Sequence, residues 1–193
     1  MRTSASNEEQ CCGCLRLRSS LITSRNCGDV VDWKSDFDPL DGGVTAQVLF
    51  LFEKPGPMAV ESGFISRDND DATAEATFKF MEQAGIPRKC TVIWNVVPWW
   101  NGTRKVTASE LSQGVAHIEA LVKLLPELSA VVMVGGKAAR AQHPLESTGL
   151  TVIGSCHPSP IVRATSRAKW EAIPGQWAQA MAALTVPDSR LGP

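Results

Sequence analysis

The sequence contains no tyrosine and only three histidines among its 193 residues, and its net charge is −1. It has no apolar run near the roughly 20 residues that cross a bilayer, so we expect no membrane-spanning helix. The first ten residues, MRTSASNEEQ, lack the apolar region of a secretory signal, and the expected location is therefore the cytoplasm. The nearly balanced charge does not by itself indicate a polyanionic partner.

Two nucleotide-binding patterns are also missing. No GxGxxG follows a candidate strand, and GGKAAR at 135–140 lacks the GK[ST] ending of a phosphate-binding loop. We interpret GGKAAR as a tight turn between a strand and a helix. These absences count against a nucleotide-binding α/β protein.

The six cysteines do not predict a metal site. Four of them lie near the N-terminus: Cys11, Cys12, Cys14 and Cys27. Their spacing fits no standard zinc or iron–sulfur pattern, and a cytosolic chain argues against disulfides. We therefore assign no metal and no cofactor, and we interpret Cys90 and Cys156 as small buried hydrophobic residues.

Short apolar runs alternate with helical patterns along the chain. The runs occupy residues 47–52, 91–97, 130–135 and 150–155. Continuous runs of this length are typical of parallel strands buried on both faces. Alternating strands and helices predict an α/β fold, a three-layer α/β/α sandwich with a central four-stranded parallel sheet.

Four helices are expected around these strands. The first covers 71–84, the second starts at the capping box of Thr107 and Glu110, and the third follows Gly135. The apolar faces of the first, second and fourth helices are, in order, Ala74, Phe78, Met81 and Ala84; Leu111, Val115, Ile118, Val122 and Leu125; and Ile173, Trp177, Met181 and Leu184. The expected organisation is an irregular extension over 1–45, one domain over 46–185 and a tail over 186–193.

Functional residues are expected where the strands end, because sites in such sheets lie at the carboxyl ends of the strands. Glu53 follows the first strand, and it either serves a site or caps a turn or pairs with Lys54 or an arginine. Asn95 is an amide within the second apolar run, and it either fixes a loop or offers a donor and an acceptor to a base edge. His157 follows the fourth strand in a proline-rich loop that holds it rigidly.

Together these motifs resemble the uracil-DNA glycosylase superfamily. EKPGP at 53–57 is similar to the Glu-x-Pro-Gly form of that family's first motif in its bacterial and archaeal branches, and HPSP at 157–160 is similar to its second motif. The resemblance covers residues 47–180. It implies an enzyme that flips uracil out of single- or double-stranded DNA and hydrolyses its N-glycosidic bond, acting as a monomer.

The resemblance also implies a role for each matching residue. His157 stabilises the negative charge that develops on the leaving base, Asn95 reads the base edge, and Phe64 stacks on the flipped base. Two further sets of matches contact DNA. The loops that grip its backbone contain Pro55, Gly56, Pro158 and Ser159, and the segment from Ile161 to Arg163 presses toward the gap that the flipped base leaves. By residue type alone, Phe64 is more consistent with an aromatic packed beneath its loop.

The chain departs from the best-known branch of this family at two positions. Lys54 stands where that branch has a catalytic aspartate, so the carboxylate that positions water is expected to be Glu53, with Asp68 as the second candidate. Gly56 stands where that branch has a tyrosine that excludes thymine, and Met58 is the expected replacement. A glycosylase for hypoxanthine, xanthine or mismatched thymine, and an inactive module that binds damaged DNA, remain alternatives.

Overall fold

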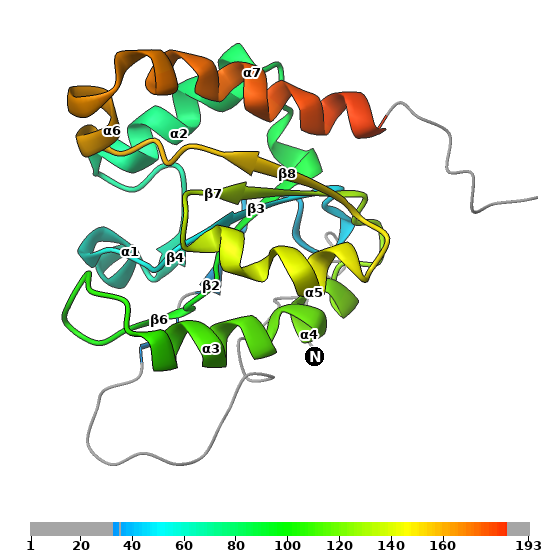
Figure 1. Cartoon of the computed structure of the whole chain (residues 1–193), viewed down its shortest axis with the longest axis horizontal. Helices are drawn as coiled ribbons and strands as arrows, with labels where there is room; N and C mark the ends of the chain where they lie inside the picture. The colour runs from blue at the N-terminus through cyan, green and yellow to red at the C-terminus, as the bar shows by residue number, and fades with distance from the viewer. Residues whose placement is uncertain (1–32, 35, 185–193) are drawn as a thin grey trace, which may run out of the picture.

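The computed structural model describes residues 33–34 and 36–184 (Figure 1). Its central sheet contains β3 (Val48–Phe52), β5 (Thr91–Asn95), β7 (Ala130–Val134) and β8 (Thr151–Ser155). The strands are all parallel, in the order β5-β3-β7-β8. This sheet confirms the four-stranded parallel arrangement predicted from the apolar runs.

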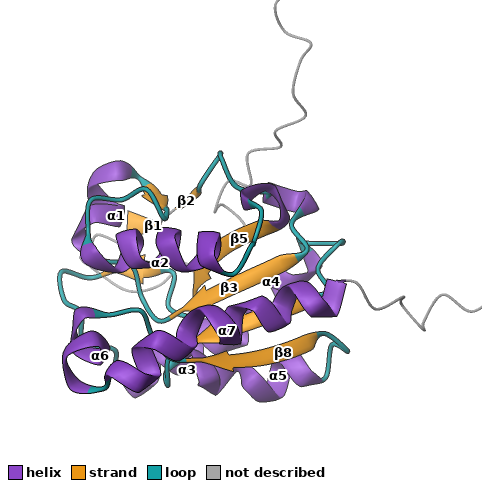
Figure 2. Ribbon diagram, turned by 90° about the horizontal axis from the view of Figure 1, so that it is seen from above, coloured by secondary structure: helices purple, strands orange, loops and turns teal. Residues whose placement is uncertain are grey.

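Helices cover both faces of the sheet (Figures 1 and 2). On one face lie α2 (Ala72–Gln83) and α7 (Arg167–Leu184). On the other face lie α3 (Ala108–Ala116), α4 (Ile118–Lys123) and α5 (Gln142–Glu146). The architecture is therefore the predicted three-layer α/β/α sandwich.

Three of the four strands are completely buried, but β8 is not. Every residue of β3, β5 and β7 is buried, whereas Thr151 and Gly154 of β8 are exposed. The expectation that β8 is buried on both faces was wrong. This strand lies at one edge of the sheet with β7 as its one neighbour, and it lacks the cover that keeps β5 fully buried at the other edge.

Trp177 fixes α7 to the sheet close to the carboxyl end of β8. Its ring is fully buried and meets Phe50 of β3 edge-on, with 5.0 Å between the ring centroids. Its indole Nε1 donates a 2.7 Å hydrogen bond to Ser155 Oγ, at the last residue of β8. A buried indole N–H requires such a partner, and this bond holds the strand end that carries His157.

Two of the predicted helix patterns need correction. The helix expected through 107–125 is interrupted at His117, where α3 ends and α4 begins. Within α2, Phe78 is 39% exposed and Phe80 only 6% exposed. The face of α2 that packs on the sheet and on α7 also includes Thr77 and Met81. Phe78 follows Thr77 by one residue, so its side chain is rotated by about 100° around the helix axis, away from this face.

Two short helices begin at prolines that were interpreted as parts of loops. They are α1 (Pro57–Ser62) and α6 (Pro160–Thr165). Proline is favoured in the first turn of a helix, because it lacks an N–H that would have no partner there and its φ is already helical. Cys90 and Cys156 are half-buried free thiols rather than fully buried residues.

Short strands complete the described part of the chain. An antiparallel pair joins β1 (Trp33–Lys34) to β6 (Trp99–Trp100), and a parallel pair joins β2 (Asp36–Phe37) to β4 (Phe64–Ile65). The end of the extension predicted to be irregular thus contains two short strands. The four N-terminal cysteines and the tail over 186–193 lie outside the described residues, among which no helix is long and apolar enough to cross a membrane.

Candidate functional site

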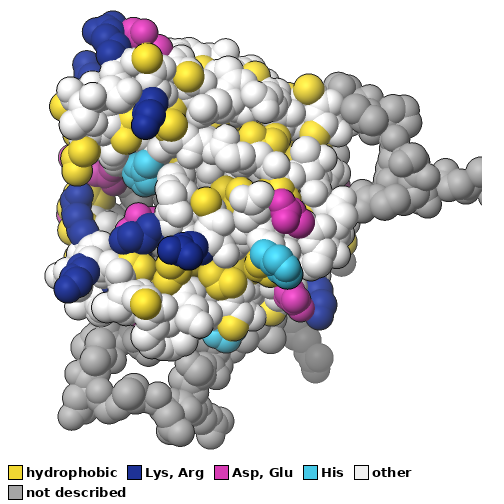
Figure 3. Space-filling model, in the orientation of Figure 1, with side chains coloured by type: hydrophobic (Ala, Val, Ile, Leu, Met, Phe, Trp, Pro, Cys, Tyr) yellow, Lys and Arg dark blue, Asp and Glu magenta, His cyan; other side chains and the backbone are white. Residues whose placement is uncertain are grey.

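A pocket of about 500 Å³ opens at the carboxyl edge of the sheet. Its walls come from the end of β3 and the loop after it, from the segment 65–77, and from Asn95, Arg104 and His157. Figure 3 shows a hollow at the edge of the molecule where the strands end, with Lys and Arg side chains around it. The volume is within the range of small-molecule sites in proteins.

His157 lines this pocket directly after β8, with one ring nitrogen hidden. Its Nδ1 is buried and has no hydrogen-bond partner among the described residues. Burial lowers the pKa of His157, and the negative charges of Glu53 and then Asp71 act against that effect. The ring is therefore neutral near pH 7, with Nε2 as the nitrogen that can reach a ligand.

Two neighbouring residues restrict the His157 ring. Phe52 meets it edge-on, with 5.5 Å between the centroids and an 87° angle between the planes. Gly135 approaches it so closely that a Cβ built there would lie 3.2 Å from His157 Cβ. Gly135 also has φ +94°, a backbone conformation that favours glycine. Any side chain at this position would strain the backbone and press against the imidazole.

Asn95 brings an unpaired amide to the same pocket. It is the last residue of β5, is only 3% exposed, and pairs in register with Phe52 of β3. Within the described chain, its side-chain amide makes no hydrogen bond to another protein group. Buried amides are normally hydrogen-bonded, so this amide is available to a ligand rather than used to fix a loop.

Glu53 lines the pocket and is paired with a lysine. Its Oε1 accepts a 2.9 Å hydrogen bond from Lys137 Nζ, in the turn after β7. The partner weighed from the sequence, Lys54, is instead bonded to Glu110 at 2.7 Å with its own side chain only 2% exposed. Burial raises the pKa of Glu110, but hydrogen bonds from Lys54 and Thr107 outweigh it and lower this pKa overall.

The loop after β3 contributes further residues to the pocket wall. Pro55, Gly56 and Met58 all line it, and Gly56 is the residue that precedes α1. The structure thus brings together Glu53 and the three residues that the sequence placed in this loop.

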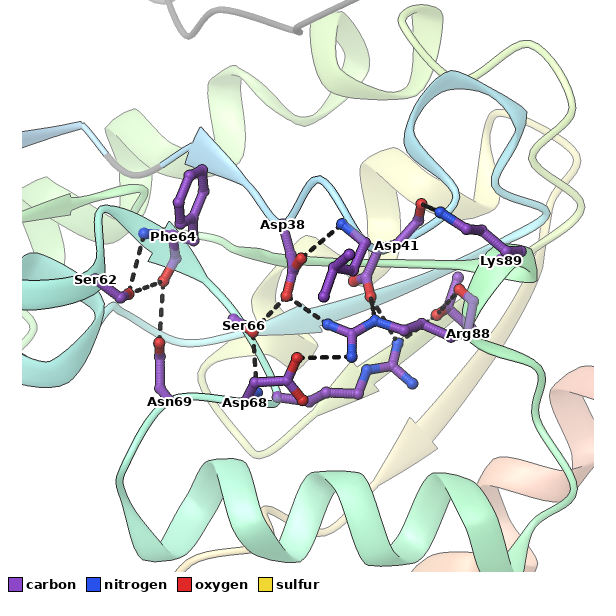
Figure 4. Close-up of polar contacts among 12 residues, drawn as sticks. Asp38, Asp41, Ser62, Phe64, Ser66, Asp68, Asn69, Arg88 and Lys89 are labelled. Carbon is purple, nitrogen blue, oxygen red and sulfur yellow. Dashed lines mark hydrogen bonds and ion pairs between the residues drawn. The ribbon is translucent and has the colours of Figure 1, made fainter. Parts of the chain in front are cut away.

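Asp68 lies outside the pocket lining and is itself exposed. It belongs to an ionic network whose other carboxylates, Asp38 and Asp41, are buried (Figure 4). The Asp68 carboxylate is 2.7 Å from Arg88, and Arg88 also binds Asp38 at 2.6 Å and Asp41 at 3.0 Å. Ser66 donates a hydrogen bond to Asp38 and accepts one from the backbone N–H of Asp68. The network therefore ties the segment that carries Asp68 to the residues before β3 and β5.

Arg67 extends this network to the pocket wall. It lines the pocket, and its guanidinium lies 3.2 Å from Asp41 and donates to the hydroxyl of Thr91. Burial raises the pKa of Asp41 to about 6, because it outweighs the attraction from Arg67 and Arg88. The same desolvation lowers the pKa of Arg67.

Phe64 is not one of the residues that line the pocket. Its side chain is partly exposed, and its carbonyl accepts hydrogen bonds from Asn69 Nδ2 at 3.0 Å and Ser62 Oγ at 3.2 Å. The next residue, Ile65, does line the pocket. The aromatic face expected to stack on a base is therefore adjacent to the cavity and accessible to solvent.

The loop that follows His157 has a rigid geometry. Pro158 is buried, and Ser159 precedes α6 and accepts a 3.3 Å hydrogen bond from Val162 N. On α6, Ile161 is 73% exposed, and the Arg163 guanidinium lies 5.8 Å from the Trp170 ring centroid. None of these residues lines the pocket, but Ile161 and Arg163 project from the element that directly follows its histidine.

Some pocket residues had not been expected from the sequence. Phe52, Arg67, Asp71 and Arg104 line the cavity, and Lys137 binds Glu53. Of these residues, Phe52 could have been predicted from the sequence, because it is the last residue of a predicted strand. The position of Lys137 depends on a contact between residues 84 positions apart, which no local pattern encodes.

A family model identifies the family of this chain. The family model described as the uracil DNA glycosylase superfamily matches residues 41–179. No curated protein matches the chain.

Two solved structures are similar to this chain. The solution NMR structure of a proposed uracil DNA glycosylase from Methanosarcina acetivorans has 16% identity and a TM-score of 0.43, covering 74% of this chain and 94% of that one. A tyrosine-to-glycine mutant of UNG from Nitratifractor salsuginis has 12% identity and a TM-score of 0.39, covering 69% and 74%.

Proposed function

The chain belongs to the uracil DNA glycosylase superfamily, and from this premise we propose that it excises uracil from DNA by hydrolysing the N-glycosidic bond. The observation that carries the proposal is the Asn95 amide, which is almost fully buried, lines the pocket and has no partner among the described residues. Uracil presents an N–H donor beside carbonyl acceptors, and a primary amide complements such an edge.

His157 would stabilise the leaving base in this reaction. The C1′–N1 bond breaks with its electron pair moving to the base, so negative charge accumulates on a base oxygen. A neutral imidazole held by Phe52 and Gly135 can donate its Nε2 proton in a hydrogen bond to that oxygen. The lowered pKa of His157 supports this role, because the neutral ring is ready at physiological pH.

Water must then add to the sugar, and we assign to Glu53 the role of orienting this water. Of the two candidates expected from the sequence, Glu53 lines the pocket, whereas Asp68 lies outside the lining and is bound to Arg88. Lys137 holds one oxygen of Glu53, which leaves the other to orient a water molecule. The proposed reaction consumes water and requires no metal or cofactor.

The other expected residues would select the base and bind the DNA. Phe64 would stack on the flipped base, and Met58, from the pocket wall, would obstruct the methyl group of thymine. Ile161 would enter the gap that the base leaves, because it is an exposed apolar side chain next to the catalytic loop. The remaining contacts to the DNA backbone are assigned to Pro55, Gly56, Pro158, Ser159 and Arg163.

A panel of oligonucleotides tests this substrate assignment. Matched strands would contain uracil, hypoxanthine, xanthine or thymine opposite guanine, and the free base would be measured. We expect release of uracil, and we expect Asn95→Ala to reduce it by about 100-fold, as is typical for the loss of one transition-state hydrogen bond. Faster release of another base would identify the alternative glycosylase, and binding without release of any base would identify an inactive module.

A further inference from the structure

Asp71 is a carboxylate of the pocket that the proposed roles do not use. It lines the cavity and directly precedes α2, a helix of 12 residues. Its Oδ1 accepts hydrogen bonds from the backbone N–H groups of Thr73 at 2.8 Å and Ala74 at 3.0 Å. These two bonds fix the orientation of the carboxylate, because both donors belong to the first turn of the helix.

The second oxygen of Asp71 has no partner in the described part of the chain. Across the residues that the structure describes, no donor binds Oδ2 and no lysine or arginine forms an ion pair with this carboxylate. Glu53 differs in being bound to Lys137, and Asp68 differs in being bound to Arg88. Asp71 is therefore a pocket carboxylate whose charge is not offset by a neighbouring cation.

Two further observations indicate that this charge faces the reactive part of the pocket. The negative charge of Asp71 acts on His157, where it opposes the effect of burial on the pKa of the imidazole. The partnerless amide of Asn95 lies in the same cavity and is 3% exposed. A ligand that reaches Asn95 and His157 would thus come under the influence of the Asp71 carboxylate.

We propose that Asp71 is a second catalytic carboxylate, which stabilises the positive charge on the sugar as the base departs. This inference rests on the proposed function and assigns a step within it. When the C1′–N1 bond breaks and its electron pair leaves with the base, C1′ and the ring oxygen share a positive charge. Water, oriented by Glu53, then adds its oxygen to C1′ and releases a proton, which neutralises the departed base anion.

The position of Asp71 suits an electrostatic role of this kind. A fixed negative charge attracts a developing cation more strongly in a partly water-excluded pocket than in bulk water. Because the helix N–H groups already hold Oδ1, the carboxylate needs no reorganisation when the charge forms. Glu53, whose charge is partly offset by Lys137, would contribute less to this stabilisation.

The variant Asp71→Asn separates the charge from the structural role of this residue. Asparagine caps a helix about as well as aspartate, so the first turn of α2 is preserved. Glu75→Gln is the matched control, because Glu75 lies in the same first turn and pairs with Lys79 on the exposed surface. Both variants lose one negative charge at the N-terminal end of α2, and thermal unfolding would establish that both are folded.

Binding of two abasic-site analogues tests the charge directly. Duplexes would carry either a pyrrolidine analogue, which is cationic at neutral pH, or its neutral tetrahydrofuran counterpart. We expect wild-type protein and Glu75→Gln to prefer the cation by about tenfold or more, and Asp71→Asn to lose this preference. In single-turnover assays, Asp71→Asn should also release uracil about 100-fold more slowly.

Each outcome has a distinct meaning. An unchanged cation preference in Asp71→Asn, or an equal loss in Glu75→Gln, would overturn the role of Asp71. If wild-type protein shows an Asp71-dependent cation preference but releases no uracil, the proposed substrate fails while the charge-stabilising role of Asp71 stands. The binding assay needs no base release, so the two failures can be told apart.

Discussion

The imidazole ring of His157 is held in place by its neighbours, and burial lowers its pKa. Phe52 and Gly135 confine the ring, and its Nδ1 is buried without a partner among the described residues. Burial disfavours the charged imidazolium and lowers the pKa, and the charges of Glu53 and Asp71 oppose that effect only in part. A histidine in this environment is suited to donate a hydrogen bond while remaining neutral.

The pH dependence of base release should report this lowered pKa. Protonated His157 would lose the neutral state on which the proposed mechanism depends, so single-turnover rates should fall on the acid side with a midpoint below 6.5. Glu53→Gln and Asp71→Asn each remove a charge that raises this pKa, and they should therefore move the midpoint to lower pH. A midpoint above 6.5 in wild-type protein would contradict this assignment.

At the residue scale, the sequence predicted part of the pocket. Glu53, Asn95 and His157 were expected together because parallel strands bring their carboxyl ends to one edge, and the structure places all three in one cavity. Asp68 and Phe64 lie outside its lining. Their segment is positioned by the ionic network, whose partners are distant in sequence and so have no local signature.

That network is the main feature at the scale of elements. Asp38 and Asp41 lie before β3, Arg88 lies before β5, and Arg67 and Asp68 lie between β4 and α2. The contacts, drawn in Figure 4, fix the segment 65–71. All residues of this segment except Asp68 line the pocket. The short strand β4 has only two residues, so much of its stability must come from these side chains.

Breaking the buried Asp41–Arg67 pair from either side should destabilise the fold. Asp41→Asn should lower the free energy of unfolding by about 3 kcal/mol, because it leaves the buried Arg67 guanidinium without its ion-pair partner, and Arg67→Met should cost less, because Arg88 still pairs with Asp41. The double variant should be less destabilised than the sum of the two, as measured by urea denaturation. Additive effects would contradict energetic coupling within the network.

Element boundaries were harder to predict than the fold class. The alternation of apolar runs and helical patterns was sufficient for the sheet, but α1 and α6 start at prolines in segments that look like loops. The sheet has two edge strands, of which β8 is partly exposed and β5 is fully buried. Strand order and the cover over each edge depend on tertiary packing rather than on the residues of the strand itself.

At the scale of the whole molecule, the polar residues of the candidate site lie together at one edge of the sandwich. The pocket opens where the strands end, and Lys and Arg side chains surround the hollow although the net charge of the chain is only −1 (Figure 3). The family match over 41–179 spans the elements that build this pocket. A local concentration of positive charge suits contact with DNA phosphates, and binding should weaken as salt increases.

Release of free uracil from an oligonucleotide with a single deoxyuridine tests the proposed function most directly. The comparison is between wild-type protein, His157→Ala and the matched control His143→Ala, whose histidine is exposed on α5 away from the pocket lining. We expect wild-type protein and His143→Ala to release the uracil stoichiometrically. For His157→Ala we expect the rate of release to be reduced by about 100-fold or more. Absence of uracil release by folded wild-type protein, or full activity in His157→Ala, would contradict the proposal.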